Sequence, residues 1–350
     1  MKNLRKILYP FSLVYDGITS VRNFLYDIGV KKSTSFDIPI IAVGNLSVGG
    51  TGKTPMVEYL IRLLSSEYRL ATLSRGYKRK SKGFFLANDT TTMEEIGDEP
   101  YQYYTKFAQL TVAVDANRVE GVNKLLQSDP NLDVIVLDDA FQHRKIKAGF
   151  YIVLSAYDEL FYDDLLLPAG NLRESSRGLT RADLVVITKC PENICEEEQN
   201  RILSHIDKSP HEVYFSSITY DKYVTNTCQK IAVSELKNDF IAVAGIAKPQ
   251  LFYKFLSCDT QNCLTFPDHH HFSPKDIFRI LEKANGKKII TTEKDYMRLQ
   301  HLLPKEQLYF LPIQMQFVVN QYSFDKIVTE YVGKSSRKRG IYKKTSDQDA

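Results

Sequence analysis

The sequence predicts an α/β protein with a doubly wound, mostly parallel sheet, followed by a second, smaller α/β lobe. Three observations predict it. Short apolar runs alternate with helical stretches, a glycine-rich loop follows the first of these runs, and the same alternation resumes after a polar stretch. Short strands that are apolar on both faces are typical of parallel sheets covered by helices on both sides.

The first unit covers residues 33–218. Apolar runs that we expect to be strands occur at residues 38–43, 70–73, 110–114, 134–137, 151–154 and 184–187. Apolar residues spaced three and four apart predict helices at residues 55–64, 99–107 and 119–126. This alternation indicates βαβ units, whose strands lie parallel in one sheet.

The second unit follows a polar, weakly patterned stretch at residues 219–239, which we expect to be a linker. Within residues 240–332, a helix at 251–256 and apolar segments at 240–244, 263–266, 277–284, 289–292 and 308–312 predict the smaller α/β lobe. Residues 333–350 are rich in Lys, Arg and Ser, and we expect them to be a basic, flexible tail.

Residues 1–32 form a separate segment with an amphipathic helical pattern. Apolar residues recur every three or four positions from Ile7 to Ile28, and six Lys and Arg residues outnumber two aspartates around them. Two interpretations fit this pattern. The helix packs its apolar face on its own domain, or it lies in a membrane interface with its basic residues at anionic lipid headgroups.

Composition excludes several classes of protein. With 43% hydrophobic and 25% charged residues, the chain is typical of a globular protein. It contains no apolar run approaching the roughly 18 residues that a membrane span needs. The formal charge of +4 is too small to indicate a nucleic-acid partner. Five cysteines without a Cys-x-x-Cys pair argue against a disulfide framework or a zinc site, and they favour a cytoplasmic location.

The strongest motif is a glycine-rich loop between the first strand and the first helix of the sheet. Backbone N–H groups of such a loop turn toward phosphate oxygens, and the helix N-terminus adds a positive field. The lysine of this motif reaches the β and γ phosphates of ATP, and the threonine hydroxyl can ligate Mg²⁺. This arrangement is that of the P-loop NTPase-type fold. The expected nucleotide-binding residues are Ser47, Val48, Gly49, Gly50, Thr51, Gly52, Lys53 and Thr54.

A second strand ends in two consecutive aspartates, Asp138 and Asp139, the arrangement in which P-loop proteins hold or orient Mg²⁺. Consecutive side chains of a strand point to opposite sides, so the two carboxylates need not share one role. A third segment, Thr188-Lys189-Cys190-Pro191, resembles the guanine-reading sequence of GTPases. It has Pro191 in place of the base-reading aspartate, which favours ATP over GTP.

Six sequence blocks, in one order, resemble the lipid A 4'-kinase family, tetraacyldisaccharide 4'-kinase. The likeness spans about residues 4–300. Its first block, residues 44–55, has Ser47 where P-loops in general have glycine, and this also matches the family. The other blocks are Ser74-Arg75-Gly76-Tyr77, Gly97-Asp98-Glu99-Pro100, Leu137-Asp138-Asp139-Ala140-Phe141-Gln142-His143, Pro168-Ala169-Gly170-Asn171-Leu172-Arg173-Glu174 and Phe266-Pro267-Asp268-His269-His270.

The resemblance implies an activity and a location. It implies transfer of the γ-phosphate of ATP, with Mg²⁺, to the 4'-hydroxyl of a tetraacylated glucosamine disaccharide 1-phosphate. It also implies that residues 1–32 are a peripheral membrane anchor, and that a two-stranded linker joins the two lobes. We therefore expect an enzyme on the cytoplasmic face of the bacterial inner membrane, and we expect a monomer.

The catalytic residues that the resemblance implies lie on both lobes. Asp98 would accept the proton of the sugar hydroxyl, and His269 of the second lobe would pair with it, so that closure of the lobes completes the site. Lys53, Asp138 and Asp139 complete the expected catalytic set. By position alone, Asp98 could instead cap the helix that follows it. His269 and its two neighbouring histidines could suggest a metal site, although adjacent side chains diverge.

Further residues of these blocks are expected to bind the acceptor or the metal. Arginines suit bidentate binding of phosphate, although each alone could be an ordinary surface residue. We expect Glu174 to join Thr54, Asp138 and Asp139 at Mg²⁺. The expected substrate-binding residues are Arg75, Tyr77, Arg118, His143, Asn171 and Arg173.

Two other functions stay open. One is a P-loop GTPase or metallochaperone, which Pro191 and the lack of a Cys/His cluster disfavour. The other is a membrane-bound nucleotide switch without catalysis of its own, which Asp98 and the acceptor blocks disfavour.

Overall fold

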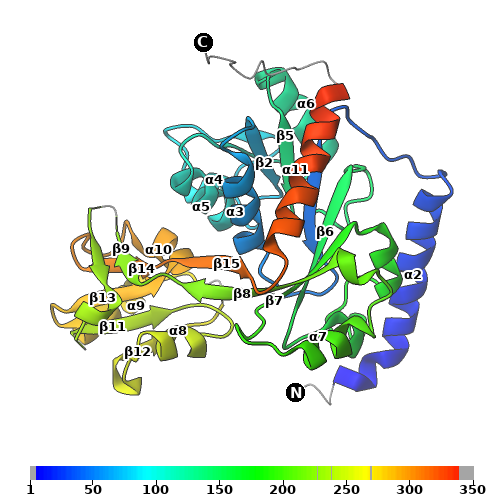
Figure 1. The fold of residues 1–350 in the computed structure, drawn as a ribbon. Helices are drawn as coiled ribbons and strands as arrows, with labels where there is room; N and C mark the ends of the chain where they lie inside the picture. The colour runs from blue at the N-terminus through cyan, green and yellow to red at the C-terminus, as the bar shows by residue number, and fades with distance from the viewer. Residues whose placement is uncertain (1–4, 227, 238, 269, 339–350) are drawn as a thin grey trace, which may run out of the picture.

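In the computed structural model, residues 5–226, 228–237, 239–268 and 270–338 are described, and they form two α/β lobes (Figure 1). The lobes are joined by two antiparallel strands, β8 (Val213–Tyr220), which leads from the larger lobe toward the smaller one, and β15 (Ile313–Phe317), which leads back. The family resemblance implied such a two-stranded connection. The expected catalytic residue His269 lies outside the described residues.

The larger lobe is built on a nine-stranded sheet within the described part of the chain. The strands from β8 to β4 in the spatial order are parallel, and the two edge strands, β15 and β3, are antiparallel to their neighbours. In that order the strands are β15 (Ile313–Phe317), β8 (Val213–Tyr220), β7 (Leu184–Thr188), β6 (Phe150–Ala156), β1 (Ile40–Asn45), β5 (Val134–Asp138), β2 (Leu70–Ser74), β4 (Thr111–Val114) and β3 (Phe85–Leu86).

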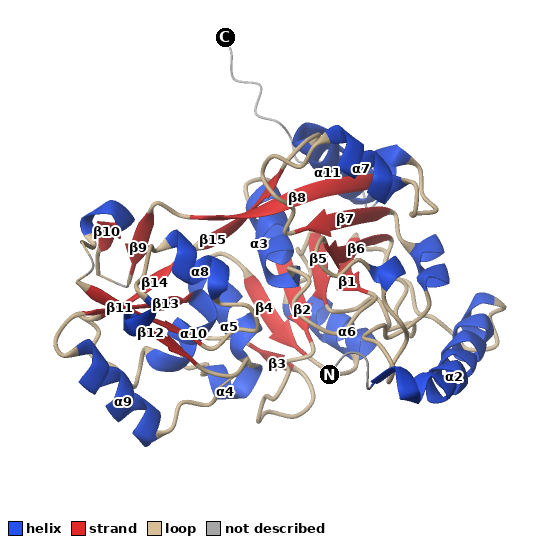
Figure 2. Ribbon diagram, turned by 90° about the horizontal axis from the view of Figure 1, so that it is seen from below, coloured by secondary structure: helices blue, strands red, loops and turns tan. Residues whose placement is uncertain are grey.

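Helices cover both faces of this sheet, because its central strands are apolar on both sides (Figure 2). Ile41 and Val43 of β1 pack in the cluster that contains α3, α5 and α11, whereas Ile40 and Ala42 pack in the cluster that contains α6. The helices of this lobe are α3 (Lys53–Leu64), α4 (Met93–Ile96), α5 (Asp98–Lys106), α6 (Arg118–Ser128), α7 (Glu196–Leu203) and α11 (Gln321–Lys338). The predicted doubly wound, mostly parallel sheet is confirmed.

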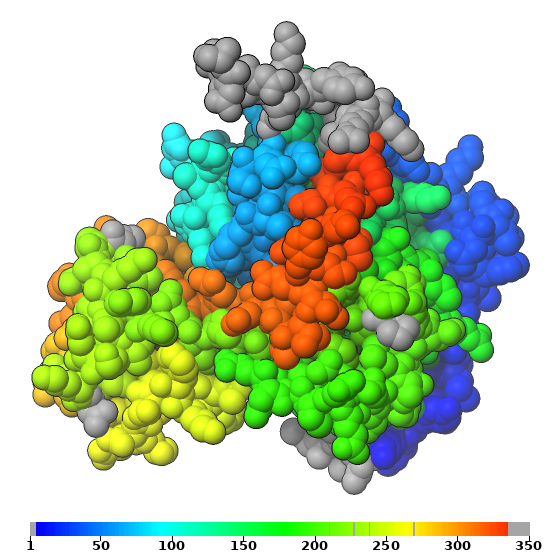
Figure 3. Space-filling view, in the orientation of Figure 1, coloured from blue at the N-terminus to red at the C-terminus, as the bar shows by residue number. Residues whose placement is uncertain are grey.

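The smaller lobe has a six-stranded sheet in its described residues, with four parallel strands and an antiparallel pair at one edge. Figure 3 shows this lobe packed against one side of the larger lobe. Its strands are, in spatial order, β10 (Lys230–Ala232), β9 (Tyr223–Thr225), β14 (Leu308–Leu311), β13 (Lys288–Thr292), β11 (Phe240–Ala244) and β12 (Cys263–Thr265). Its helices are α8 (Gln250–Phe255), α9 (Pro274–Ala284) and α10 (Glu293–Leu299).

Three of the expected boundaries are wrong. The expected linker, residues 219–239, contains β9 and β10, which belong to the smaller sheet. The expected smaller lobe, residues 240–332, ends instead at β14, because β15 and α11 return to the larger lobe. Residues 333–338 of the expected tail continue α11. Phe324, Val328 and Val332 are fully buried in the larger core, so a long-range packing contact, which local sequence does not report, decides where this helix belongs.

The N-terminal helix α2 (Tyr9–Asp27) lies along the outside of the larger lobe, on the side away from the smaller lobe (Figures 1 and 2). Its buried residues are polar, Ser12 and Thr19, and its apolar stripe is exposed. The expected helix is therefore present, but it does not pack its apolar face on its own domain. Among the described residues, no helix is long and apolar enough to cross a membrane.

We predict that Phe324→Ala destabilises the protein by about 3–5 kcal/mol, because it leaves a cavity among Tyr59, Tyr214 and Phe317. The measurement is the free energy of unfolding in a denaturant titration. Tyr322→Ala on the same helix is the control, because Tyr322 is 80% exposed and its loss should cost less than about 0.5 kcal/mol. Equal effects of the two substitutions would show that α11 is not part of the core.

Candidate active site

The phosphate loop and the two aspartates meet at one edge of the larger sheet. β1 and β5 are parallel neighbours, with Val43 beside Asp138, so both strands end at the same edge. The loop follows β1, and α3 begins at Lys53. Gly52 has a φ of 84°, in the left-handed region where a side chain would be strained. The local sequence thus produces the predicted strand–loop–helix unit at the carboxyl end of the sheet, where ligands bind in folds of this kind.

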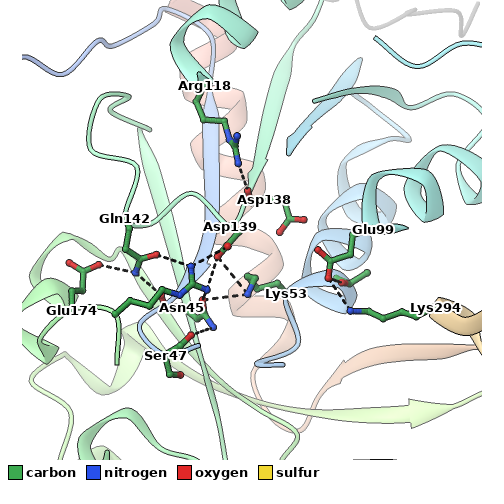
Figure 4. Close-up of polar contacts among 12 residues, drawn as sticks. Asn45, Ser47, Lys53, Glu99, Arg118, Asp138, Asp139, Gln142, Glu174 and Lys294 are labelled. Atoms are coloured by element: carbon green, nitrogen blue, oxygen red, sulfur yellow. Dashed lines mark hydrogen bonds and ion pairs between the residues drawn. The ribbon is translucent and has the colours of Figure 1, made fainter. Parts of the chain in front are cut away.

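Lys53 points toward the end of β5 (Figure 4). Its ammonium lies 3.4 Å from Oδ1 of Asn45, where β1 ends, and 3.6 Å from Oδ1 of Asp139. The side chain is 14% exposed, so its charge is only partly screened by water. Lys53 is therefore held at the mouth of the loop by groups from both central strands.

Asp139 is an ionised carboxylate. Arg173 donates to both of its oxygens at 3.1 Å, and Arg173 also donates to Oδ1 of Asn45 at 2.8 Å. Burial acts to raise the pKa of Asp139, but the nearby charges of Lys53 and Arg173 outweigh it and lower that pKa. Arg173, expected to bind substrate, thus holds Asp139 and the end of β1 in place.

The pKa of Asp138 is shifted in the opposite direction to that of Asp139. Its side chain is 3% exposed, and burial, followed by the charge of Glu99, raises its pKa to about 7. The hydroxyl of Tyr103 donates to Oδ2 at 3.2 Å, while Oδ1 is buried and has no hydrogen-bond partner among the described residues. The pKa values of the two aspartates are thus shifted in opposite directions.

The residues around the loop fit a bound Mg²⁺. The unsatisfied Oδ1 of Asp138 is a hard oxygen of the kind that Mg²⁺ prefers, and so is the Thr54 hydroxyl, which donates to Oε1 of Glu99 at 3.2 Å. Within the described ranges, no group of three His, Cys, Asp or Glu side chains could hold a metal by itself. Mg²⁺ is commonly bound by one or two carboxylates together with the phosphates of a nucleotide.

Glu174, which was expected at the metal, contacts three other side chains in this structure. Its carboxylate is 3% exposed and accepts from Gln142 at 2.9 Å and from Asn23 of α2 at 3.1 Å. Arg181 forms an ion pair with the same group. Both oxygens are therefore occupied, and Figure 4 shows Glu174 on the far side of Asn45 from Asp138. Glu174 thus links α2 to the segment that follows β5.

Arg118, which was expected to bind substrate, is buried and contacts the backbone. It is 2% exposed and donates to the backbone carbonyls of Asp115 and Asp138, the latter at 3.2 Å. Burial lowers the pKa of Arg118 to about 10, so the side chain keeps its charge at neutral pH. Its role is to support the end of β5 from behind.

The other expected substrate residues fall into two groups. Arg75 and Tyr77 are exposed on the loop after β2, where a ligand can reach them. Asn171 braces the phosphate loop, because its carbonyl accepts from the N–H of Val48 at 2.7 Å. Burial and the surrounding arginines and lysines lower the pKa of His143 to about 4, so its ring is neutral. Its Nε2 is buried without a hydrogen-bond partner among the described residues.

Asp98 lies at the start of α5. Gly97 occupies the N-cap position of α5 and Asp98 is the first residue of the helix, where its Oδ1 accepts from the backbone N–H of Glu99 at 3.1 Å. Asp98 and Glu99 each meet a cation of helix α10 in the smaller lobe. Arg298 pairs with Asp98, and Lys294 lies 2.9 Å from Oε1 of Glu99.

Sequence reasoning missed several of these residues. Glu99 lies inside a block that the sequence had singled out, so its place beside Asp98 was a usable signal. No motif in the sequence pointed to Lys294 or Arg298, because their contacts form only where the two lobes meet. Asn45 and Tyr103 are polar groups in buried surroundings, and only the tertiary structure shows what they contact.

Comparisons with known proteins identify the family. Residues 4–333 match the family described as tetraacyldisaccharide-1-P 4'-kinase (LpxK). The chain is 55% identical to the tetraacyldisaccharide 4'-kinase of Flavobacterium johnsoniae, over 95% of this chain and 98% of the relative. It is 44% identical to that of Bacteroides thetaiotaomicron, over 95% of each chain.

A solved structure agrees with this match. The crystal structure of "apo" form LpxK from Aquifex aeolicus, in complex with ATP, superimposes with a TM-score of 0.75 at 31% identity. The alignment covers 94% of this chain and 99% of that one. The phosphate loop, the two aspartates and the second lobe thus occur in a fold shared along nearly the whole chain. The chain belongs to the tetraacyldisaccharide-1-phosphate 4'-kinase family.

Proposed function

We propose that this chain transfers the γ-phosphate of ATP to the 4'-hydroxyl of a tetraacyldisaccharide 1-phosphate in lipid A biosynthesis. One observation carries the proposal. The phosphate loop, with Lys53 beside Asp139, contacts the start of α5 through Thr54 and Glu99, and the adjacent carboxylate, Asp98, is paired with Arg298 of the smaller lobe. In a chain of this family, that arrangement supplies both a nucleotide site and a proton acceptor.

The nucleotide side of the site is electrostatic. The loop amides and Lys53 bind the phosphates, and Lys53 stabilises negative charge that develops as the γ-phosphate leaves. Thr54 and Asp138 would hold Mg²⁺, which neutralises charge on the phosphate oxygens. Asp139, fixed by Arg173, orients the Lys53 ammonium.

The acceptor side needs a group that takes the proton of the sugar hydroxyl. Asp98 suits this role because it is a carboxylate, 13% exposed, paired with an arginine that favours its ionised form. We infer that His269 assists it from the smaller lobe, as the family resemblance implies. The exposed Arg75 and Tyr77 are placed to contact the sugar or its phosphate.

Two observations weigh against the rival functions. The Thr188–Lys189 segment does contact the phosphate loop, with the Thr188 hydroxyl donating to the carbonyl of Thr51 at 2.8 Å and Lys189 donating to that of Gly50. Pro191 nevertheless offers no carboxylate to guanine. A metallochaperone would need a metal cluster, and the described ranges hold no group of three suitable side chains.

The deciding experiment supplies ATP labelled on the γ-phosphate with a tetraacyldisaccharide 1-phosphate. Label should appear at the 4' position of the glycolipid, with GTP a poor donor. Label released only as inorganic phosphate, or a preference for GTP, would support the GTPase alternative instead.

We further infer that α2 lies on the anionic face of a membrane. Its polar side holds it to the larger lobe. The Ser12 hydroxyl donates to the carbonyl of Leu166 at 2.9 Å, and the Tyr15 hydroxyl donates to that of Arg173 at 2.9 Å. Its opposite side is apolar and open, with more than half of each side chain exposed at Phe11, Leu13, Val14, Ile18, Val21 and Phe24.

The outward-facing apolar side of α2 supports contact with lipid. A helix with its apolar face outward needs an apolar partner, and the exposed Lys31 and Lys32 follow its C-terminal end, where anionic headgroups would meet them. Membrane binding would place the enzyme where an acylated substrate resides. We infer a peripheral, cytoplasmic location on the inner membrane, and a monomer.

Lys53→Ala should lower kcat by about 10²-fold or more, because its ammonium acts on charge that develops during transfer. The measurement is steady-state phosphotransfer, with circular dichroism to confirm the fold. Lys326→Ala on the outer surface of α11 is the control and should leave the rate unchanged. A folded Lys53 variant with near wild-type turnover would contradict the assignment.

Asp98→Asn and His269→Ala should each lower kcat by about 10²- to 10⁴-fold, with little change in the KM for ATP, because neither is assigned to the nucleotide. If the two act as a unit, the double variant should be scarcely slower than Asp98→Asn. The exposed His301→Ala is the control. Fully additive losses would rule out a dyad, and an undiminished rate in Asp98→Asn would rule out the base.

A double substitution, Ile18→Glu with Phe24→Glu, should weaken binding to vesicles containing anionic phospholipid by at least about tenfold, because it removes apolar burial worth about 1.5–3 kcal/mol per residue. Substitution is preferable to deletion, since the polar side of α2 contacts the larger lobe. Leu251→Glu, 66% exposed on the smaller lobe, is the control. Unchanged vesicle binding would contradict the proposal, as would a shift from dimer to monomer in sedimentation, which would assign this face to a second copy.

A further inference from the structure

The proposed catalytic carboxylate has its charge partner on the other lobe. Asp98 begins α5 in the larger lobe, and Arg298 lies on α10 in the smaller lobe, 200 positions later in the chain. Nη2 of Arg298 donates to Oδ2 of Asp98, and the two side chains are 10% and 13% exposed. A contact so shielded from water is screened far less than an ion pair on the surface.

Arg298 is itself held in place. Its Nη1 lies 3.2 Å from Oδ1 of Asp295, which is fully buried. Oδ2 of Asp295 accepts from the backbone N–H of Gly245 at 2.8 Å and from the hydroxyl of Thr292 at 2.7 Å. A Cβ at residue 245 would lie 2.9 Å from Oδ1 of Asp295, so a glycine is needed there. The guanidinium is therefore held by Asp295, which is itself fixed by groups at the end of β11 and the start of α10.

The neighbouring ion pair, Lys294 with Glu99, contacts a different part of the site. Lys294, one turn before Arg298 on α10, pairs with Glu99, whose Oε1 also accepts from the Thr54 hydroxyl of the phosphate loop. Lys294 is thus linked to the nucleotide side of the site. Arg298 lies on the acceptor side, where it contacts Asp98. One helix of the smaller lobe supplies a separate cation to each of two adjacent carboxylates.

We propose that Arg298 is a positioning residue that holds Asp98 oriented and ionised for accepting the hydroxyl proton. This rests on the proposed function of Asp98. Arginine suits the role because it stays protonated and therefore never competes for the transferred proton. Its planar fork also binds two carboxylates at once, Asp295 behind and Asp98 in front. Because Arg298 belongs to the smaller lobe, its contact with Asp98 depends on the packing of α10 against α5.

The test compares Arg298→Ala and Arg298→Lys in the full-length enzyme with labelled ATP and tetraacyldisaccharide 1-phosphate. We expect Arg298→Ala to lower kcat by about 10- to 100-fold, the effect of a misplaced catalytic group, with the KM for ATP within about twofold. Arg298→Lys should recover part of the loss, because it keeps the charge but not the fork. Arg201→Ala, which removes a surface arginine from an i,i+3 carboxylate pair on α7, should have no effect.

A second arm separates positioning from a general loss of structure. In an Asp98→Asn background, Arg298→Ala should cause no further loss of kcat, because its effect passes through the carboxylate. An equal loss in both backgrounds, or a raised KM for ATP with kcat unchanged, would overturn the proposal. The failures are distinguishable. If the wild-type enzyme labels no glycolipid, the proposed function is wrong, and if Asp98→Asn keeps its rate, the base and with it the role of Arg298 are wrong.

Discussion

The parallel pairing of β1 with β5 is the constraint on which the active site depends. Its register sets Val43 beside Asp138, so the strand that enters the phosphate loop and the strand that ends in aspartates finish at one edge. Both strands are buried between helical layers, and a slip of one residue would exchange the side chains that face each layer. The sheet therefore determines where Lys53 stands, and the loop can consist of small, flexible residues that admit phosphate.

Burial gives the two adjacent aspartates opposite chemistry. Asp138 stays within the strand and is fully enclosed, which raises its pKa and leaves one oxygen unsatisfied. Asp139 turns out of the strand, with a φ of 50°, into the reach of Lys53 and Arg173, which lower its pKa. A single peptide unit thus separates an oxygen suited to a metal ion from a carboxylate that orients a lysine.

Charged contacts between α5 and α10 orient the two lobes relative to each other. Besides the pairs of Asp98 and Glu99, Lys106 of α5 lies 2.7 Å from Glu58 of α3 and 2.5 Å from Glu293 of α10. Burial, followed by the charge of Glu58, raises the pKa of Glu293 to about 7, so this group is costly to enclose. Such contacts add specificity of orientation more than stability. Here they align the acceptor side of the site with the nucleotide side.

The sequence by itself determined the alternation of strands and helices, the phosphate loop, the paired aspartates and the block that contains Asp98. These features depend on local periodicity and on short motifs, whose residues act within a few positions of one another. Only the tertiary structure decided that β15 and α11 return to the larger lobe, and that α2 turns its polar side inward. It also showed which groups Glu174 and Arg118 contact, and that Arg298 meets Asp98. Each of these depends on contacts between residues far apart in the chain, such as Asn23 with Glu174 across 151 positions. Local sequence patterns do not indicate which distant surfaces will pack together.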